Sequence, residues 1–91
     1  MAEPLAATAT ITNKLGLHAR AAAKLVEAAA RFQSRIQVKK DSESVDARSI
    51  LGLMMLNARP GTQIEVIADG PDAPEAMHAI LALIEAKFGE D

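Results

Sequence analysis

The chain has 91 residues, of which 49% are hydrophobic, with a formal net charge of −2 and no cysteine. This length fits one small domain over residues 1–91, the hydrophobic content excludes a disordered chain, and the apolar runs are too short to span a bilayer. Disulfides and thiolate chemistry are excluded, and two phenylalanines without an interleaved basic stripe argue against nucleic-acid binding. The first residues lack the basic region of a secretory signal, so we expect a cytoplasmic protein without membrane insertion.

Four segments alternate apolar and polar residues, which predicts strands, and three segments repeat apolar residues at helical spacing. The strands are expected at 5–12, 35–39, 44–46 and 62–68, and the helices from 18 to about 30 or 32, from 50 to about 56, and from 73 to 88. This β-α-β-β-α-β-α order, with helix stripes that pack on one face of a sheet, predicts a two-layer α+β domain.

The last helix has distinctive residues at both ends. Asp72 and Glu75 are spaced as a capping box at its start. Gly89, Glu90 and Asp91 follow Phe88, the last apolar residue of the helix stripe. We expect these three residues to form a frayed end.

The first helix begins with a histidine and an arginine and lacks an ordinary cap. No Ser, Thr, Asp or Asn stands between Leu15 and Lys24, so the usual side-chain acceptor for the first backbone N–H groups is missing. Orphan N–H donors beside the Arg20 guanidinium favour an anion, and the nucleophilic imidazole of His18 is suited to carry it covalently. The alternative is that both side chains are simply exposed polar residues.

Ser49 is a good N-cap for a short helix that is apolar nearly all round, at 50–56. A small domain cannot bury every face of such a helix, and an exposed apolar cluster often marks a partner site. The competing interpretation is that most of these side chains belong to the core, as we expect for Leu53 and Leu56.

Two stretches carry a family resemblance: the run GLHAR at 16–20 and the Ser-led segment SILGLMML at 49–56. Together they resemble the HPr family, the histidine phosphocarriers of the bacterial phosphotransferase system, and the similarity covers essentially the whole chain. Residues 13–16 and 63–66 are more similar to the NPr branch, which serves nitrogen-related phosphotransfer. The resemblance implies an open-faced two-layer sandwich with a four-stranded antiparallel sheet and three helices on one face.

The resemblance also implies a role for the first-helix residues. His18 would accept a phosphoryl group on Nδ1, as a pros-phosphohistidine, from phosphoenolpyruvate-dependent enzyme I and pass it to an EIIA-type acceptor of a sugar or nitrogen-related system. Arg20 would neutralise the transferred group. The protein would thus be a phosphoryl carrier and not an enzyme. We expect a monomer without cofactor or metal, and we interpret the second histidine, His78, as a surface residue.

Partner binding and regulation are expected around the second helix. The partner-binding surface would combine Ala19, Ala23, Ile50, Leu51, Met54 and Met55 with the Arg20 side chain. In the resembling family, the serine that corresponds to Ser49 is a substrate of a dedicated HPr Ser kinase/phosphorylase. A phosphate there would add a charge of about −1.5 to −2 beside the apolar surface and weaken docking. Helix capping alone also explains this serine.

The chain departs from the family pattern at Ala21, where the family usually has proline. Proline would fix φ and remove one N–H from the first helical turn, and we interpret the alanine as a neutral substitution.

A second hypothesis is a regulatory docking domain that controls partner enzymes by protein–protein binding. It predicts that partner affinity depends on Leu51 or Met54 and survives His18→Ala. A small-ligand α+β domain is a weaker third hypothesis, because the sequence has no Gly-rich phosphate cradle.

Overall fold

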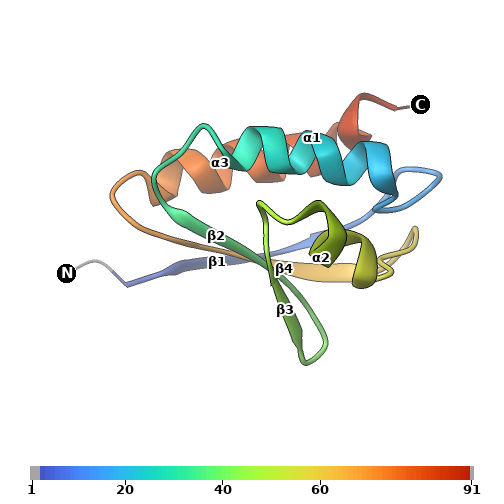
Figure 1. The fold of residues 1–91 in the computed structure, drawn as a ribbon, viewed down its shortest axis with the longest axis horizontal. Helices are drawn as coiled ribbons and strands as arrows, with labels where there is room; N and C mark the ends of the chain where they lie inside the picture. The colour runs from blue at the N-terminus through green and yellow to red at the C-terminus, as the bar shows by residue number, and fades with distance from the viewer. Residues whose placement is uncertain (1–2, 91) are drawn as a thin grey trace.

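A four-stranded antiparallel sheet forms one layer of the molecule, and helices cover one of its faces (Figure 1). The computed structural model describes residues 3–90. Its strands are β1 (Leu5–Thr10), β2 (Arg35–Lys40), β3 (Glu43–Asp46) and β4 (Gln63–Asp69), and its helices are α1 (Ala19–Ala29), α2 (Ile50–Met55), α3 (Ala73–Glu85) and a short 3-10 helix, η1 (Lys87–Gly89). The predicted α+β class and the order of the seven predicted elements are confirmed, and η1 is an addition.

The sheet order is β1-β4-β2-β3, so β4 lies between the first two strands of the chain. Val66 on β4 is opposite Ala7 on one side and Val38 on the other. Just after β1, the Ile11 N–H donates to the Thr62 carbonyl at 2.9 Å. This topology places the loop that leads to His18 beside the segment that precedes β4.

The core lies between the sheet and the two long helices, α1 and α3, which run side by side (Figure 1). Alternation along β2 and β4 sends every second side chain into this core, as the strand pattern predicted. Large buried side chains there include Ile36, Val38, Ile64, Val66, Leu25, Ile80 and Ile84. The short α2 packs against α1 and β3. No helix within residues 3–90 has the length and apolar character needed to cross a membrane.

Two helices end earlier than the periodicity indicated. α1 ends at Ala29, because the N–H groups of Arg31 and Phe32 turn to carbonyls three residues back, at 3.2 Å each. α3 ends at Glu85, because the residues of η1 have left-handed backbone angles, with φ of +57°, +56° and +75° along the segment. The other boundaries agree with the prediction to within two residues.

The prediction of a frayed end is wrong for the residues that the structure describes. Phe88 is completely buried, and the Glu90 side chain is only 15% exposed. Burial of the aromatic ring holds the segment against the body of the protein. Asp91 lies outside the described residues.

The predicted capping box at α3 is also wrong. Asp72 makes no side-chain cap bond, and its carboxylate accepts hydrogen bonds from the Ser34 hydroxyl and from the N–H groups of Gln33 and Ser34. The Ser34 hydroxyl, followed by the Gln33 N–H, lowers the pKa of Asp72 below its ordinary value. The carboxylate therefore ties the α1–β2 loop to α3 instead of capping the helix.

Candidate functional site

The loop between β1 and α1 holds His18 in one position. Gly16 makes the turn with φ of +68°, and a Cβ at this residue would come within 2.5 Å of the Ala58 carbonyl oxygen. The N–H of the buried Leu17 donates to that same carbonyl at 2.9 Å. Only glycine fits this turn, and the turn fixes the loop against the segment before β4.

His18 is the N-cap residue of α1, and its imidazole takes the place of an ordinary cap side chain. The backbone is extended, and Nδ1 accepts the N–H of Arg20 at an N···N distance of 3.3 Å. The first α-helical bond runs from the Ala22 N–H to the His18 carbonyl at 2.8 Å. The usual cap residues are missing, but the expectation that the first N–H groups are all orphan donors is wrong for Arg20, because an imidazole nitrogen with a free lone pair also accepts a hydrogen bond.

The other ring nitrogen of His18 meets a carboxylate from the far end of the chain. Nε2 lies 2.5 Å from Glu90 Oε2, and Glu90 Oε1 accepts a bond from Asn13 Nδ2 at 3.0 Å. The hydrogen bond from Asn13, followed by the bond from His18, holds the pKa of Glu90 below its ordinary value. Glu90 is therefore a charged neighbour of the imidazole near neutral pH.

Asn13 links this carboxylate to the loop. Its side chain is fully buried, and Nδ2 also donates to the Gly16 carbonyl at 2.7 Å. Its Oδ1 is buried without a hydrogen-bond partner among residues 3–90.

Sequence reasoning missed Asn13 and Glu90 as site residues. The available signal was Phe88, an aromatic residue on the helix stripe that anchors the chain two residues before Glu90.

An open hollow of about 680 Å³ lies beside His18, between the β1–α1 loop, the start of α1 and Glu90. Its lining residues are Lys14, Leu15, His18, Ala19, Arg20 and Glu90. The Arg20 side chain is exposed, and the His18 side chain is 27% exposed. The structure thus brings the predicted residues His18, Ala19 and Arg20 together with the unpredicted Glu90, in a place that a partner protein can reach.

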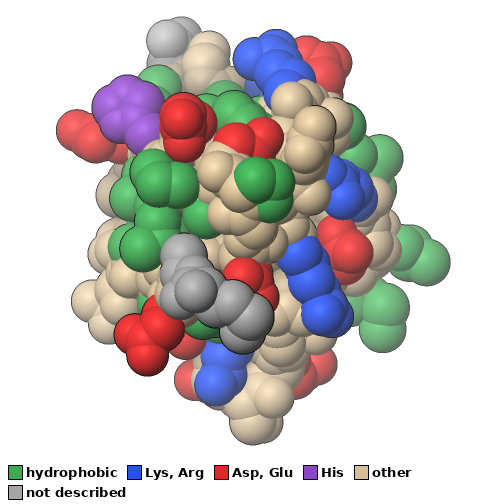
Figure 2. All heavy atoms as spheres, turned by 90° about the vertical axis from the view of Figure 1, so that its left-hand side faces the viewer, with side chains coloured by type: hydrophobic (Ala, Val, Ile, Leu, Met, Phe, Trp, Pro, Cys, Tyr) green, Lys and Arg blue, Asp and Glu red, His purple; other side chains and the backbone are tan. Residues whose placement is uncertain are grey.

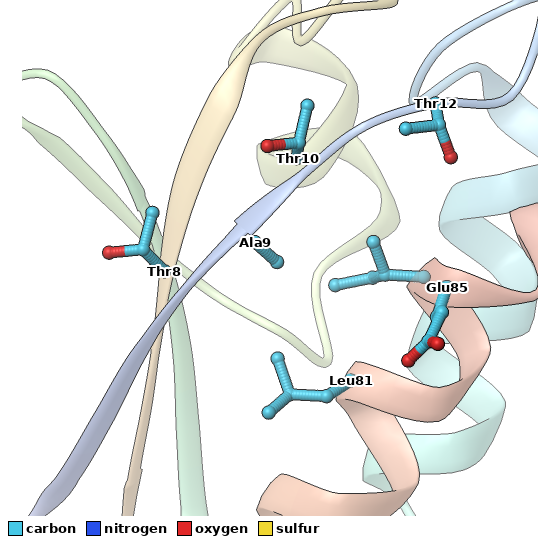
Figure 3. A pocket seen from close by; sticks show the side chains of 7 residues that line it. Thr8, Ala9, Thr10, Thr12, Leu81 and Glu85 are labelled. Atoms are coloured by element: carbon cyan, nitrogen blue, oxygen red, sulfur yellow. The ribbon is translucent and has the colours of Figure 1, made fainter.

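The other surfaces that we compared with the His18 hollow bring together fewer groups that could react with or bind a ligand. A hollow of about 310 Å³ between β1 and α3 is lined by threonines, apolar residues and the single carboxylate of Glu85 (Figure 3). The face shown in Figure 2 mixes acidic and basic side chains. His78 is exposed on α3, and within residues 3–90 no three His, Cys, Asp or Glu side chains gather closely enough to hold a metal ion.

Ser49 caps α2, and much of that helix is exposed. Ser49 Oγ accepts the Gly52 N–H at 3.0 Å. The prediction that Leu53 and Leu56 belong to the core is confirmed. The large side chains left exposed on α2 are Ile50, Leu51, Met54 and Met55, of which Leu51 and Met55 are more than 70% exposed.

The exposed α2 side chains continue toward His18. Ala19 and Ala23 are exposed on α1, which packs against α2. A hollow of about 210 Å³ is lined by both His18 and Met54. The residues of the predicted partner surface therefore lie on exposed parts of two neighbouring helices beside the imidazole.

Comparison with known proteins gives consistent matches. Residues 5–86 match the model of the family described as "PTS HPr component phosphorylation site". The phosphocarrier protein HPr of Cupriavidus necator is 53% identical over 89% of this chain and 91% of that protein. The phosphocarrier protein NPr of Shewanella violacea is 47% identical over 89% of each. The crystal structure of HPr-C-His from Thermoanaerobacter tengcongensis superposes with a TM-score of 0.92 at 46% identity, over 96% of this chain and 98% of that one.

The fold and these matches define the class of phosphocarrier proteins, which carry a phosphoryl group and are not enzymes. Proteins of this class act together with the enzymes of the phosphotransferase system. More particularly, the chain belongs to the HPr family. The predicted open-faced sandwich with three helices on one face of the sheet is confirmed by this structural match.

Proposed function

We propose that the protein carries its phosphoryl group on Nδ1 of His18, as a pros-phosphohistidine. The observation that carries this proposal is the position of the imidazole as the N-cap of α1, with Nδ1 facing the Arg20 N–H. A phosphoryl group on Nδ1 would have its oxygens near the N–H groups of the first helical turn. The Arg20 guanidinium lines the same hollow and is suited to neutralise these oxygens.

The donor of the phosphoryl group is phosphoenolpyruvate-dependent enzyme I, and the recipient is an EIIA-type acceptor of a sugar or nitrogen-related system. Both would dock on the surface formed by Ala19, Ala23, Ile50, Leu51, Met54 and Met55. The exposure of these side chains beside His18 supports this part of the proposal. Flexible methionines suit a surface that must accept more than one partner. The carrier acts as a cytoplasmic monomer.

Ser49 is the proposed regulatory phosphorylation site, with an HPr Ser kinase/phosphorylase as its modifying partner. A phosphate at the start of α2 is electrostatically tolerated by the helix, so the added charge need not unfold it. The same charge would stand beside the exposed Ile50 side chain and oppose apolar docking.

The test is phosphorylation with enzyme I and labelled phosphoenolpyruvate. We expect an acid-labile phosphoprotein for the wild type and for His78→Ala, which removes an exposed histidine on α3. We expect no label on His18→Ala. Equal labelling of His18→Ala and wild type would reject His18 as the carrier residue.

A regulatory docking domain is the second candidate, because two large side chains of α2 are more than 70% exposed. In that case partner affinity would follow substitutions at Leu51 or Met54 and survive His18→Ala. Titration of the partner with unphosphorylated variants separates the two functions.

A further inference from the structure

Both carboxylate oxygens of Glu90 make hydrogen bonds at the candidate site. One oxygen lies 2.5 Å from His18 Nε2, and the other accepts from Asn13 Nδ2 at 3.0 Å. Asn13 also donates to the Gly16 carbonyl, so the loop that carries His18 also positions the carboxylate. The contact spans 72 residues of sequence and is a product of the fold.

The two partners of the imidazole require one tautomer. The Arg20 backbone N–H can only donate, so Nδ1 must present its lone pair. The ionised Glu90 carboxylate can only accept, so Nε2 must carry the proton. A neutral ring held between them therefore has its nucleophilic lone pair on Nδ1.

The backbone around Phe88 is held in an uncommon conformation that keeps Glu90 in reach. Lys87 and Phe88 both have positive φ, which is rare for bulky residues. Burial of the Phe88 ring and a bond from Lys24 Nζ to the Phe88 carbonyl at 2.6 Å stabilise this turn. Strained backbone that the surrounding structure maintains beside a candidate site suggests a function for the residue it positions.

We propose that Glu90 is a positioning residue for phosphoryl transfer, which fixes the proton on Nε2 of His18 and balances the charge of the phosphorylated ring. This inference rests on the proposed function of His18. In the transfer step the Nδ1 lone pair forms the N–P bond, and the bond from phosphorus to the donor breaks with its electrons on the donor. Nε2 keeps its proton, so the ring becomes cationic next to the Glu90 carboxylate, which stabilises the developing charge.

Glu90→Gln tests this role, with Glu85→Gln as the matched control. Both variants lose one negative charge, but Glu85 is an exposed residue of α3 that makes no contact with His18 among the described hydrogen bonds and ion pairs. Asn13 Nδ2 and His18 Nε2 face different oxygens of Glu90. In glutamine one of these oxygens becomes an NH2 group that can only donate, so in the same side-chain conformation one of the two donors loses its acceptor. Thermal unfolding of each variant confirms that it remains folded.

The first readout is the ¹⁵N spectrum of the His18 ring in the unphosphorylated protein, which requires no partner. We expect a protonated Nε2 and a bare Nδ1 in the wild type and in Glu85→Gln, and shifts that move toward a tautomer mixture in Glu90→Gln. The second readout is the initial rate of phosphorylation, which should fall roughly tenfold in Glu90→Gln. This magnitude is the lower end of the loss that follows when the hydrogen-bond partner that orients a metal-binding histidine is removed.

Identical ring spectra for Glu90→Gln and wild type would overturn the proposal, and so would an altered spectrum with an unchanged rate. A wild type that enzyme I does not phosphorylate would reject the proposed function of His18 and the transfer role of Glu90. In that case a changed ring spectrum in Glu90→Gln would still support the assignment of the Nε2 proton to this carboxylate.

Discussion

Phe88→Ala should destabilise the protein strongly, although Phe88 lies only three positions from the end of the sequence. The side chain is completely buried, and truncating a buried phenylalanine to alanine costs about 3–5 kcal/mol. A domain of this size has about 5–15 kcal/mol of stability in total. The substitution should therefore remove a large part of the free energy of unfolding.

The measurement is urea unfolding of Phe88→Ala beside Leu51→Ala, a control that truncates an apolar side chain with 71% exposure. Leu51→Ala should change stability by no more than about 0.5 kcal/mol. With a shift of about 4–8 °C per kcal/mol, Phe88→Ala should lower Tm by at least about 12 °C. A cost below about 1 kcal/mol would refute the reasoning, because it would mean that burial of the Phe88 ring does not hold the end of the chain against the core.

Three further substitutions test the loop, the α3 contact and the family departure. Gly16→Ala should cost about 1–3 kcal/mol in urea unfolding, because φ is +68° and the new Cβ would meet a backbone oxygen at 2.5 Å. Asp72→Asn should remove part of the acid dependence of stability. The pKa of Asp72 in the folded protein lies below the ordinary value of 3.8. The stabilisation by the Ser34 hydroxyl is therefore fully present above pH 3.8 and is lost as the pH falls through the folded-state pKa. Ala21→Pro should change the free energy of unfolding by less than about 1 kcal/mol, because the N–H at this position precedes the first α-helical hydrogen bond.

Controls separate these effects from general ones. Gly61 also has positive φ, but a Cβ there has no atom within 4 Å, so Gly61→Ala should cost less than Gly16→Ala. Asp69→Asn removes an exposed carboxylate and should leave the acid transition closer to that of wild type than Asp72→Asn does. Equal costs for the two glycine variants, an acid transition in Asp72→Asn identical to that of wild type, or a large loss of stability in Ala21→Pro would each contradict the corresponding argument.

The parts of the structure that follow from neighbouring residues were predictable from sequence. Alternation placed the strands, and the spacing of apolar residues placed the helices, because each pattern reports which face of its own segment is buried. Ser49 was recognised as a cap because its bond partner, the Gly52 N–H, is three residues away. The exposure of Leu51 and Met55 followed from the small size of the domain.

The rest depends on partners that are distant in sequence. Asp72 was expected to cap its own helix, but its carboxylate accepts from the Ser34 hydroxyl and from the N–H groups of Gln33 and Ser34 in place of the local amides. Glu90 was assigned to a frayed end, because no local pattern shows that the chain turns at residues 87–89 and brings Glu90 within reach of His18. The imidazole was treated only as a carrier, although it also serves as the cap of α1.

The central claim is that His18 carries the phosphoryl group on the ring nitrogen that faces the start of α1. The most direct measurement is the ³¹P–¹⁵N NMR spectrum of the protein after phosphorylation by enzyme I, with both histidine rings labelled. The account predicts phosphorus bonded to Nδ1 of His18, with the proton retained on Nε2 beside Glu90. Phosphorus on Nε2 of His18, or on His78, would contradict it.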